Sequence, residues 1–111
     1  MVLVEISFVP IGVGESLSRY IAHCMDIIDK SGLNYQFHPM GTIIEGELEE
    51  VFDLIIKCRN SLRKKFPECN RLLINIKVDD RKGVKEALKY KIKSVEEKLG
   101  RTLTKSPASE E

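Results

Sequence analysis

Two segments with strictly alternating side chains, residues 2–10 and 71–79, most constrain what this chain can fold into. Every second residue in each segment is apolar, as Ile6 and Phe8 are in the first. A period of two over this length is typical of a β-strand that has one face in a core. We therefore expect both segments to be strands of one sheet, with the first strand ending at Pro10.

The residues between these two strands change to helical spacing, return to two short strands, and change to helical spacing again. Gly32 is a typical C-terminal stop for the first helix, and the turn residues Pro39 to Gly41 separate the short strands. The expected elements are strands at 2–10, 33–38, 42–46 and 71–79, and helices between Leu17 and Gly32 and at 47–65. This βαββαβ order is that of a ferredoxin-like α+β fold, with both helices on one face of an antiparallel sheet. We expect the first and fourth strands to neighbour each other at the centre of the sheet.

An additional helix is predicted at residues 82–99. Its apolar residues form a narrow stripe: Val84, Leu88, Ile92, Val95 and Leu99. A stripe of this width beyond the βαββαβ unit indicates packing against the domain edge or a second subunit. Residues 1–100 are thus expected to form a single domain including this helix, and residues 101–111 a flexible tail.

Composition excludes several functional classes. The 111 residues suit one domain, and 18 basic against 17 acidic residues give a net charge of +1, which argues against a general nucleic-acid binder. No segment has the apolar length of a membrane span, so we expect a cytoplasmic protein with no membrane partner. Cys24, Cys58 and Cys69 are odd in number and have no metal-ligand spacing, so we expect no metal site. We also expect no cofactor. Cys24 and Cys58 are expected to be buried, and Cys69 to be exposed in a polar turn.

The sheet face opposite the helices is the most informative surface that the pattern predicts. Strand phase places a mixed set of side chains there: Glu5, Ser7, Ile43, Glu45, Asn75 and Lys77. One interpretation is a solvated face with cross-strand ion pairs such as Glu5–Lys77. The other is a pocket between this face and a partner subunit, in which a few polar groups orient a ligand between apolar walls.

Three segments carry a resemblance to a known family: Val9 to Gly12, Gly32 to Gly46 with its Met-Gly-Thr-Ile-Ile-Glu-Gly sequence, and Ile76 to Arg81. Over residues 2–99 the chain resembles the thiamine-binding protein family of small ferredoxin-like domains, which includes YkoF-like proteins. The resemblance implies an intracellular protein that binds thiamine or its hydroxymethylpyrimidine moiety without catalysis. It also implies self-association into dimers and tetramers, which would give the last helix a partner.

With thiamine as the ligand, the segment from His38 to Glu47 becomes the best candidate for the site. An aminopyrimidine and a cationic thiazolium require a carboxylate, neutral hydrogen-bonding groups and apolar walls. We expect Glu45 to bond the pyrimidine and Glu5 to offset the positive charge. The full set of candidate ligand-binding residues is Glu5, Ser7, Phe37, Met40, Thr42, Glu45 and Asn75.

Three alternatives stay open at this point. A catalytic role would need an acid/base pair such as Glu5 with Glu45, because the neighbours His23 and Cys24 point about 100° apart on a helix. A regulatory domain that senses amino acids has the same fold, and so does a structural oligomer without a ligand. RNA recognition is disfavoured, since the open face lacks the aromatic residues on which bases stack.

Overall fold

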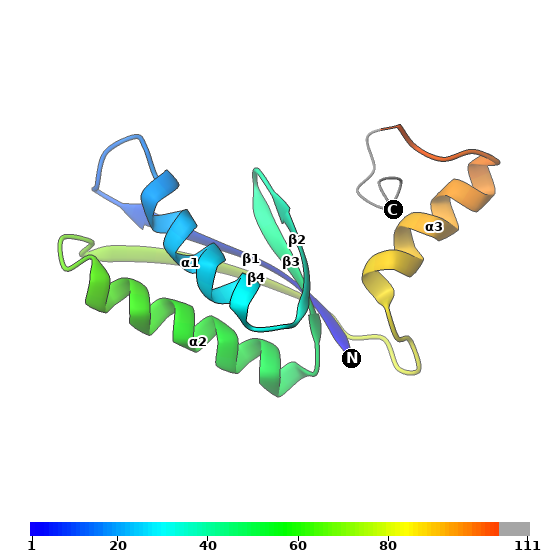
Figure 1. Cartoon of the computed structure of the whole chain (residues 1–111), viewed down its shortest axis with the longest axis horizontal. Helices are drawn as coiled ribbons and strands as arrows, with labels where there is room; N and C mark the ends of the chain where they lie inside the picture. The colour runs from blue at the N-terminus through cyan, green and yellow to red at the C-terminus, as the bar shows by residue number, and fades with distance from the viewer. Residues whose placement is uncertain (105–111) are drawn as a thin grey trace.

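A computed structural model describes residues 1–104 of the chain as four strands and three helices (Figure 1). The expected tail at 101–111 lies outside the described residues from position 105 onward. The elements are β1 (Val2–Ile11), α1 (Ser18–Lys30), β2 (Asn34–His38), β3 (Gly41–Gly46), α2 (Leu48–Lys65), β4 (Arg71–Asp79) and α3 (Ala87–Leu99). Their order confirms the predicted ferredoxin-like fold with a C-terminal helix.

The four strands form one antiparallel sheet in the order β2-β3-β1-β4, and α1 and α2 cover the same face of it (Figure 1). The prediction that β4 lies at the centre of the sheet is wrong, because β1 has β3 and β4 as its two neighbours and leaves β4 at the edge. This position explains why Ile76 and Val78 remain 42% and 40% exposed although they share the strand phase of the core residues.

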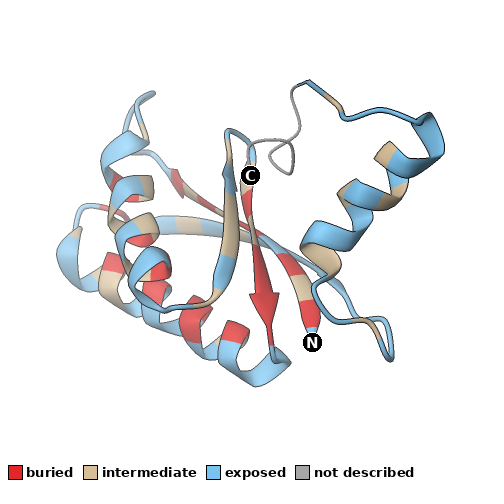
Figure 2. Ribbon diagram, turned by 45° about the vertical axis from the view of Figure 1, so that its right-hand side comes forward, coloured by how far each residue is buried: buried red, intermediate tan, exposed pale blue. Residues whose placement is uncertain are grey.

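The core lies between the sheet and the two helices. Figure 2 shows its buried residues along β1 and β3 and on the inner sides of α1 and α2. Val4, Ile44 and Leu62 are fully buried, and α1 packs on α2 where Cys24 and Cys58 face each other. The alternation predicted for β1 and β3 is therefore confirmed, since Thr42 and Ile44 point toward the helices while Ile43 points away.

Pro10 does not end the first strand, as the sequence had led us to expect. β1 continues through Pro10 to Ile11 and pairs with β4 over this whole length, whereas its pairing with β3 ends at Ile6 and Thr42. Because no strand lies on the β3 side at Pro10, a residue without a backbone N–H is tolerated there. The same geometry leaves a notch in the sheet beside residues 7–10.

The cysteines are free thiols, and all three are buried. Burial of Cys24 and Cys58 confirms the prediction, but the expected exposure of Cys69 is wrong. The turn after α2 folds back under the helix end, where Arg63 donates to the Cys69 carbonyl oxygen at 2.6 Å and the Cys69 N–H bonds the Phe66 carbonyl oxygen at 3.0 Å. This local hydrogen bonding holds Cys69 inside a turn that is polar in sequence.

α3 begins at Ala87, five residues later than predicted, and extends away from the rest of the molecule (Figure 1). Gly83 and Glu86 have φ angles of 79° and 56°, which a right-handed helix cannot include. None of the residues of α3 is buried. In its first turns the Leu88 N–H donates to Glu45 and Lys91 pairs with Asp79, and both contacts attach α3 to the sheet.

The Lys91–Asp79 contact predicts a pH-dependent attachment of α3. The hydrogen bond and positive charge of Lys91 lower the pKa of Asp79. A carboxylate with a lowered folded-state pKa contributes stability above its unfolded pKa, about 4, and loses it as the pH falls through the folded value. At neutral pH we expect Asp79→Asn to speed proteolytic cleavage between residues 80 and 86. Asp80→Asn removes the same charge one position along and should leave the cleavage rate unchanged; equal rates for both variants would contradict this role.

Candidate functional site

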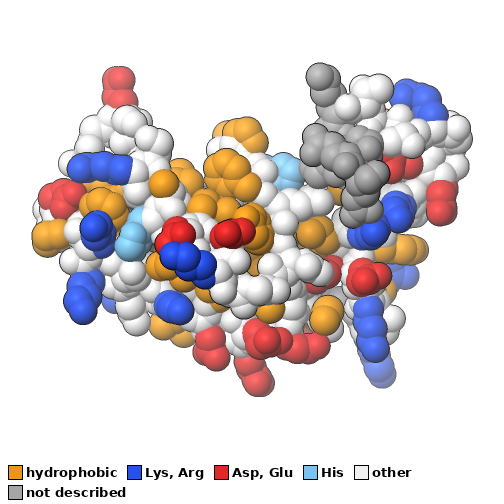
Figure 3. Space-filling view, viewed as in Figure 1, with side chains coloured by type: hydrophobic (Ala, Val, Ile, Leu, Met, Phe, Trp, Pro, Cys, Tyr) orange, Lys and Arg blue, Asp and Glu red, His pale blue; other side chains and the backbone are white. Residues whose placement is uncertain are grey.

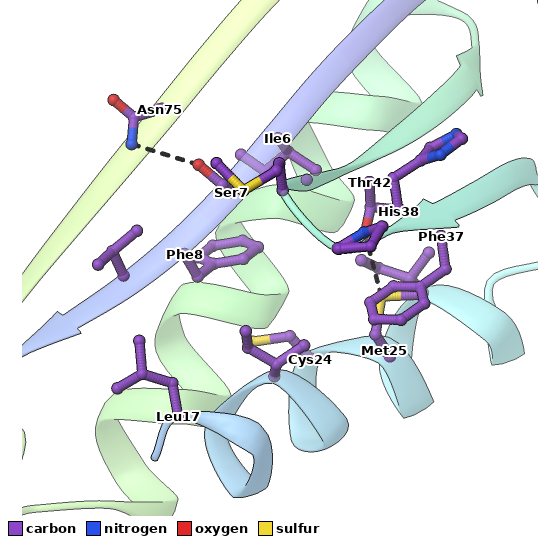
Figure 4. Close-up of a pocket in the computed structure, with 16 residues that line it drawn as sticks. Ile6, Ser7, Phe8, Leu17, Cys24, Met25, Phe37, His38, Thr42 and Asn75 are labelled. Atoms are coloured by element: carbon purple, nitrogen blue, oxygen red, sulfur yellow. Dashed lines mark hydrogen bonds between the residues drawn. The ribbon is translucent and has the colours of Figure 1, made fainter. Parts of the chain in front are cut away.

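A cavity of about 360 Å³ lies at the notch in the sheet, between α1, the unpaired side of β1 and the β2–β3 hairpin. β1 supplies Ser7, Phe8 and Val9 to its wall, because these residues lie beyond the end of the β3 pairing. Figure 4 shows side chains from α1 and from both strands of the hairpin around the same space. The cavity thus exists because β1 is longer than β3.

Two hydrogen-bonded pairs place polar groups in the cavity wall (Figure 4). The Asn75 side-chain amide on β4 donates to Ser7 Oγ at 3.2 Å, and the Thr42 hydroxyl donates to the sulfur of Met25 on α1 at 3.2 Å. A thioether is a weak acceptor, so the Thr42 hydroxyl keeps capacity for a better partner. The Ser7–Asn75 pair likewise has an unused carbonyl oxygen on Asn75 and a hydroxyl proton on Ser7.

Apolar and aromatic side chains form the rest of the wall and its rim. Phe8 and Leu17 line the interior, while Phe37 and Met40 are 58% and 90% exposed on the hairpin. In Figure 3, hydrophobic side chains gather over this hairpin. An apolar rim beside a cavity with few polar groups is the usual character of a small-molecule site.

No Asp, Glu, Lys or Arg is among the sixteen described residues that line the cavity. Cys24 lies in the same wall, and the hydrogen bond with Cys58, together with burial, raises the pKa of the Cys24 thiol. Cys24 therefore presents a neutral thiol at physiological pH. The electrostatic character of the interior suits an uncharged group that can donate and accept hydrogen bonds.

Gly41 keeps the hairpin close to β1 at the mouth of the cavity. A Cβ atom at this position would lie 3.3 Å from the Ile6 carbonyl oxygen and 3.6 Å from Glu5 Cγ. The Met-Gly-Thr segment singled out in the sequence thus has a steric reason for its glycine. The same distances place Glu5 beside the mouth, on the open face of the sheet.

The structure brings five of the seven predicted site residues to this cavity and places two elsewhere. Those that line it are Ser7, Phe37, Met40, Thr42 and Asn75. Glu5 is exposed on the open face, directly opposite Lys77 in the strand register. Glu45 is only 4% exposed and accepts from the Leu88 N–H at 3.0 Å and the Asn34 side-chain amide at 3.4 Å. Glu45 thus accepts a hydrogen bond from the first turn of α3. The alternation of side chains along β3 could not predict that α3 would cover the Glu45 carboxylate.

Sequence reasoning missed the contribution of α1 to the site. Leu17 and Ile21 recur at the helical spacing predicted for this segment, and together with Met25 they line the cavity. The sequence also did not predict the contact between His23 and α2. The His23 Nε2 atom lies 2.7 Å from Ser61 Oγ on α2, and residue spacing within one helix cannot predict a contact with another helix. That pair lies outside the cavity lining.

The described part of the chain contains neither a membrane-spanning helix nor a metal cluster. None of the helices within residues 1–104 combines the length and apolar character needed to cross a bilayer. Over the same residues, no three His, Cys, Asp or Glu side chains group closely enough to hold a metal ion.

Comparisons of the sequence with known proteins agree on one family. A family model described as thiamine-binding protein matches residues 4–96. The UPF0045 protein YqgV of Bacillus subtilis is 34% identical over 104 residues, covering 89% of this chain and 98% of the relative. The UPF0045 protein MJ1052 of Methanocaldococcus jannaschii is 27% identical over 96 residues, covering 86% and 93% of the two chains.

Solved structures share the fold. The crystal structure of MJ1052 matches with a TM-score of 0.76, covering 86% of this chain and 96% of that one. The Thermotoga maritima protein TM0486, provisionally assigned to thiamine biosynthesis or salvage, matches with a TM-score of 0.72 at 24% identity, covering 85% and 97%. At that identity the likeness to TM0486 shows the fold alone.

Proposed function

The chain belongs to the thiamine-binding protein family, and from this premise we propose that its cavity binds the hydroxymethylpyrimidine half of thiamine without catalysis. The observation that carries the proposal is a cavity whose lining, in the described residues, contains no Asp, Glu, Lys or Arg and has the Ser7–Asn75 pair in its wall. An aminopyrimidine is flat, neutral and aromatic, with an amino donor and ring-nitrogen acceptors. The Asn75 amide and the Ser7 and Thr42 hydroxyls offer both kinds of partner.

The size of the cavity favours one ring of thiamine rather than the whole molecule in its interior. At about 360 Å³ it lies near the lower end of ligand sites. A permanently cationic thiazolium would lose its hydration inside without gaining a countercharge. We therefore place the thiazolium at the mouth, where the Glu5 carboxylate stands beside Gly41.

Binding of a free amino acid is less well supported. An amino acid carries an ammonium and a carboxylate, and each needs an oppositely charged or strongly hydrogen-bonding partner when it is desolvated. Within residues 1–104 the cavity lining contains no Asp, Glu, Lys or Arg to pair with these groups. Glu5 and Glu45, the carboxylates considered for acid/base chemistry, also lie outside it, so we propose a binding role.

Calorimetry with the two halves of thiamine tests the proposal. Hydroxymethylpyrimidine and thiamine should both bind, with affinities within about tenfold of each other, because the buried contacts are the same. The neutral hydroxyethylthiazole half should give no heat at the same concentration. Binding of the thiazole half alone, or of neither thiamine nor the pyrimidine, would refute the assignment.

Single hydrogen-bonding groups should contribute modestly to this affinity. We expect Ser7→Ala and Asn75→Ala each to weaken pyrimidine binding by about 1 kcal/mol, roughly fivefold, the usual net value of a neutral hydrogen bond. Ser16→Ala and Asn60→Ala are matched controls at exposed positions outside the cavity. Equal affinities for the site and control variants would move the ligand elsewhere.

We also propose that the protein self-associates as a dimer or tetramer, as its family suggests. The open face of the sheet is uncovered over much of its area, with Leu73 48% exposed. On α3, Val95 and Leu99 are each 50% exposed. Apolar surface on an unsupported helix favours a second copy of the chain as its cover.

A further inference from the structure

Two of the three cysteines face each other where α1 packs on α2. Cys24 is 2% exposed, Cys58 is fully buried, and both are free thiols. The Cys58 thiol donates to the Cys24 carbonyl oxygen at 3.8 Å, and a second hydrogen bond joins the two side chains. Beside this pair, the contact of 2.7 Å between His23 and Ser61 also links the two helices. The packing of α1 on α2 therefore holds the two thiols together as neighbours.

The pair is connected to the cavity through Cys24. Among the described residues that line the cavity is Cys24 but not Cys58 (Figure 4). A buried cysteine commonly serves as a small hydrophobic side chain and is inert. Cys24 differs because a small uncharged molecule in the cavity lies against it without any opening of the core.

We propose that Cys24 and Cys58 form a reversible redox-modification site, in which hydrogen peroxide that enters the cavity oxidises the pair to a disulfide. The Cys24 sulfur attacks one peroxide oxygen, the O–O bond breaks, and water leaves with the thiol proton, so that Cys24 becomes a sulfenic acid. The Cys58 sulfur then attacks the Cys24 sulfur, the S–O bond breaks, and a second water leaves with the Cys58 proton. Two electrons pass from the sulfur atoms to the peroxide, whose two oxygen atoms end as two water molecules.

The hydrogen bond between the thiols favours Cys58 as the attacking group of the second step. This hydrogen bond lowers the pKa of Cys58, whereas together with burial it raises the pKa of Cys24. Because the thiolate is the nucleophile, the first step at Cys24 is slow, and the pair responds to sustained rather than brief exposure to peroxide. An S–S bond is about 2.05 Å long, so its formation draws the Cys24 sulfur toward α2. Shielding of Cys24 by a bound pyrimidine rests on the proposed function, whereas the disulfide itself does not.

Mass spectrometry of the folded chain after treatment with hydrogen peroxide tests the pair. The intact mass should fall by about 2 Da, digestion should yield Cys24 linked to Cys58, and dithiothreitol should restore both thiols. Cys69→Ser should form the same bond at the same rate, because Cys69 lies in the turn after α2 with its thiol on the Arg71 carbonyl oxygen at 3.5 Å. Cys58→Ser has no second thiol in the pair, so Cys24 should instead gain one oxygen, about 16 Da. Circular dichroism shows whether each variant keeps its fold.

Oxidation in urea separates the folded arrangement from chance pairing. In an unfolded chain the shorter loop between Cys58 and Cys69 closes more readily than the loop between Cys24 and Cys58. The bond between Cys58 and Cys69 should therefore dominate in urea, and the bond between Cys24 and Cys58 in native buffer. The same mixture of bonds under both conditions, or a native chain that only gains oxygen, would overturn the inference.

Two measurements test the route of the oxidant through the cavity. With hydroxymethylpyrimidine at about ten times its Kd, about one-tenth of the sites stay free, so oxidation should slow about tenfold. Without any ligand, Leu17→Trp adds a ring in the cavity wall and should slow oxidation several-fold. Leu48→Trp is the matched control, since Leu48 on α2 is 45% exposed and outside the cavity lining. An equal rate of oxidation in the two tryptophan variants would refute this route.

Calorimetry with hydroxymethylpyrimidine separates this inference from the proposed function. If the unaltered chain binds the pyrimidine but forms no bond between Cys24 and Cys58, the redox site fails and the proposed function stands. If the bond forms and Leu17→Trp slows it, but the unaltered chain binds no pyrimidine, the proposed function fails alone.

Discussion

Replacing Ile21 with tryptophan should reduce pyrimidine binding at least a hundredfold, a loss of about 2.8 kcal/mol. Ile21 lies on α1, half-buried, in the wall of the cavity. A larger ring at this position would occupy the space proposed for the ligand. Calorimetry measures the loss, and thermal unfolding shows whether the variant keeps its fold.

Ile56→Trp is the matched control for this experiment. Ile56 lies on α2, is 55% exposed, and does not contribute to the cavity lining. The same change of residue should therefore leave pyrimidine affinity within about twofold of the original. If Ile21→Trp binds as tightly as Ile56→Trp, the ligand does not enter this cavity.

Ile44→Ala should lower the free energy of unfolding by about 3–4 kcal/mol. Ile44 is fully buried on the helix side of β3, so its removal leaves a cavity as well as lost apolar contact. Ile43 is the neighbouring residue on the opposite face and is only partly buried. Ile43→Ala should cost about 1 kcal/mol. Urea unfolding of both variants at one protein concentration measures the difference, and equal losses would mean that the strand phase is wrong.

The phase of the strands and the order of the elements followed directly from side-chain periodicity. Residues 71–79 were predicted with the bounds that the structure has, because alternation over nine residues fixes both the element and its face. The second helix was predicted at 47–65 and is observed at Leu48–Lys65, with Glu49 and Glu50 in its first turn, where acidic residues favour a helix N-terminus. These features depend on local sequence alone.

The features that the sequence could not predict depend on contacts between distant segments. The position of β4 at the edge is set by which strands pair, and the continuation of β1 through Pro10 depends on where β3 ends. The burial of Glu45 comes from α3, whose late start depends on backbone angles at Gly83 and Glu86. Side-chain periodicity predicts on which face of a strand or helix a residue lies, but it does not predict which other segment covers that face.

The candidate site shows the same division. Sequence reasoning selected Ser7, Thr42 and Asn75, and the structure gathers them at one cavity. It placed the expected pocket on the open face, however, whereas the cavity passes through the notch beside β1 to the helix side. The notch arises because β1 is longer than β3. The types of side chain in the two strands do not predict this difference in length.

Mapping backbone amide chemical shifts during titration with hydroxymethylpyrimidine tests the central claim most directly. The account predicts that the largest shifts occur at the cavity, at the amides of Ser7, Gly41, Thr42 and Asn75, with small changes at Glu45 and Leu88 under α3. Shifts concentrated at Glu45 and Leu88, or spread over the outer surface of α2, would contradict a pyrimidine site in the notch of the sheet.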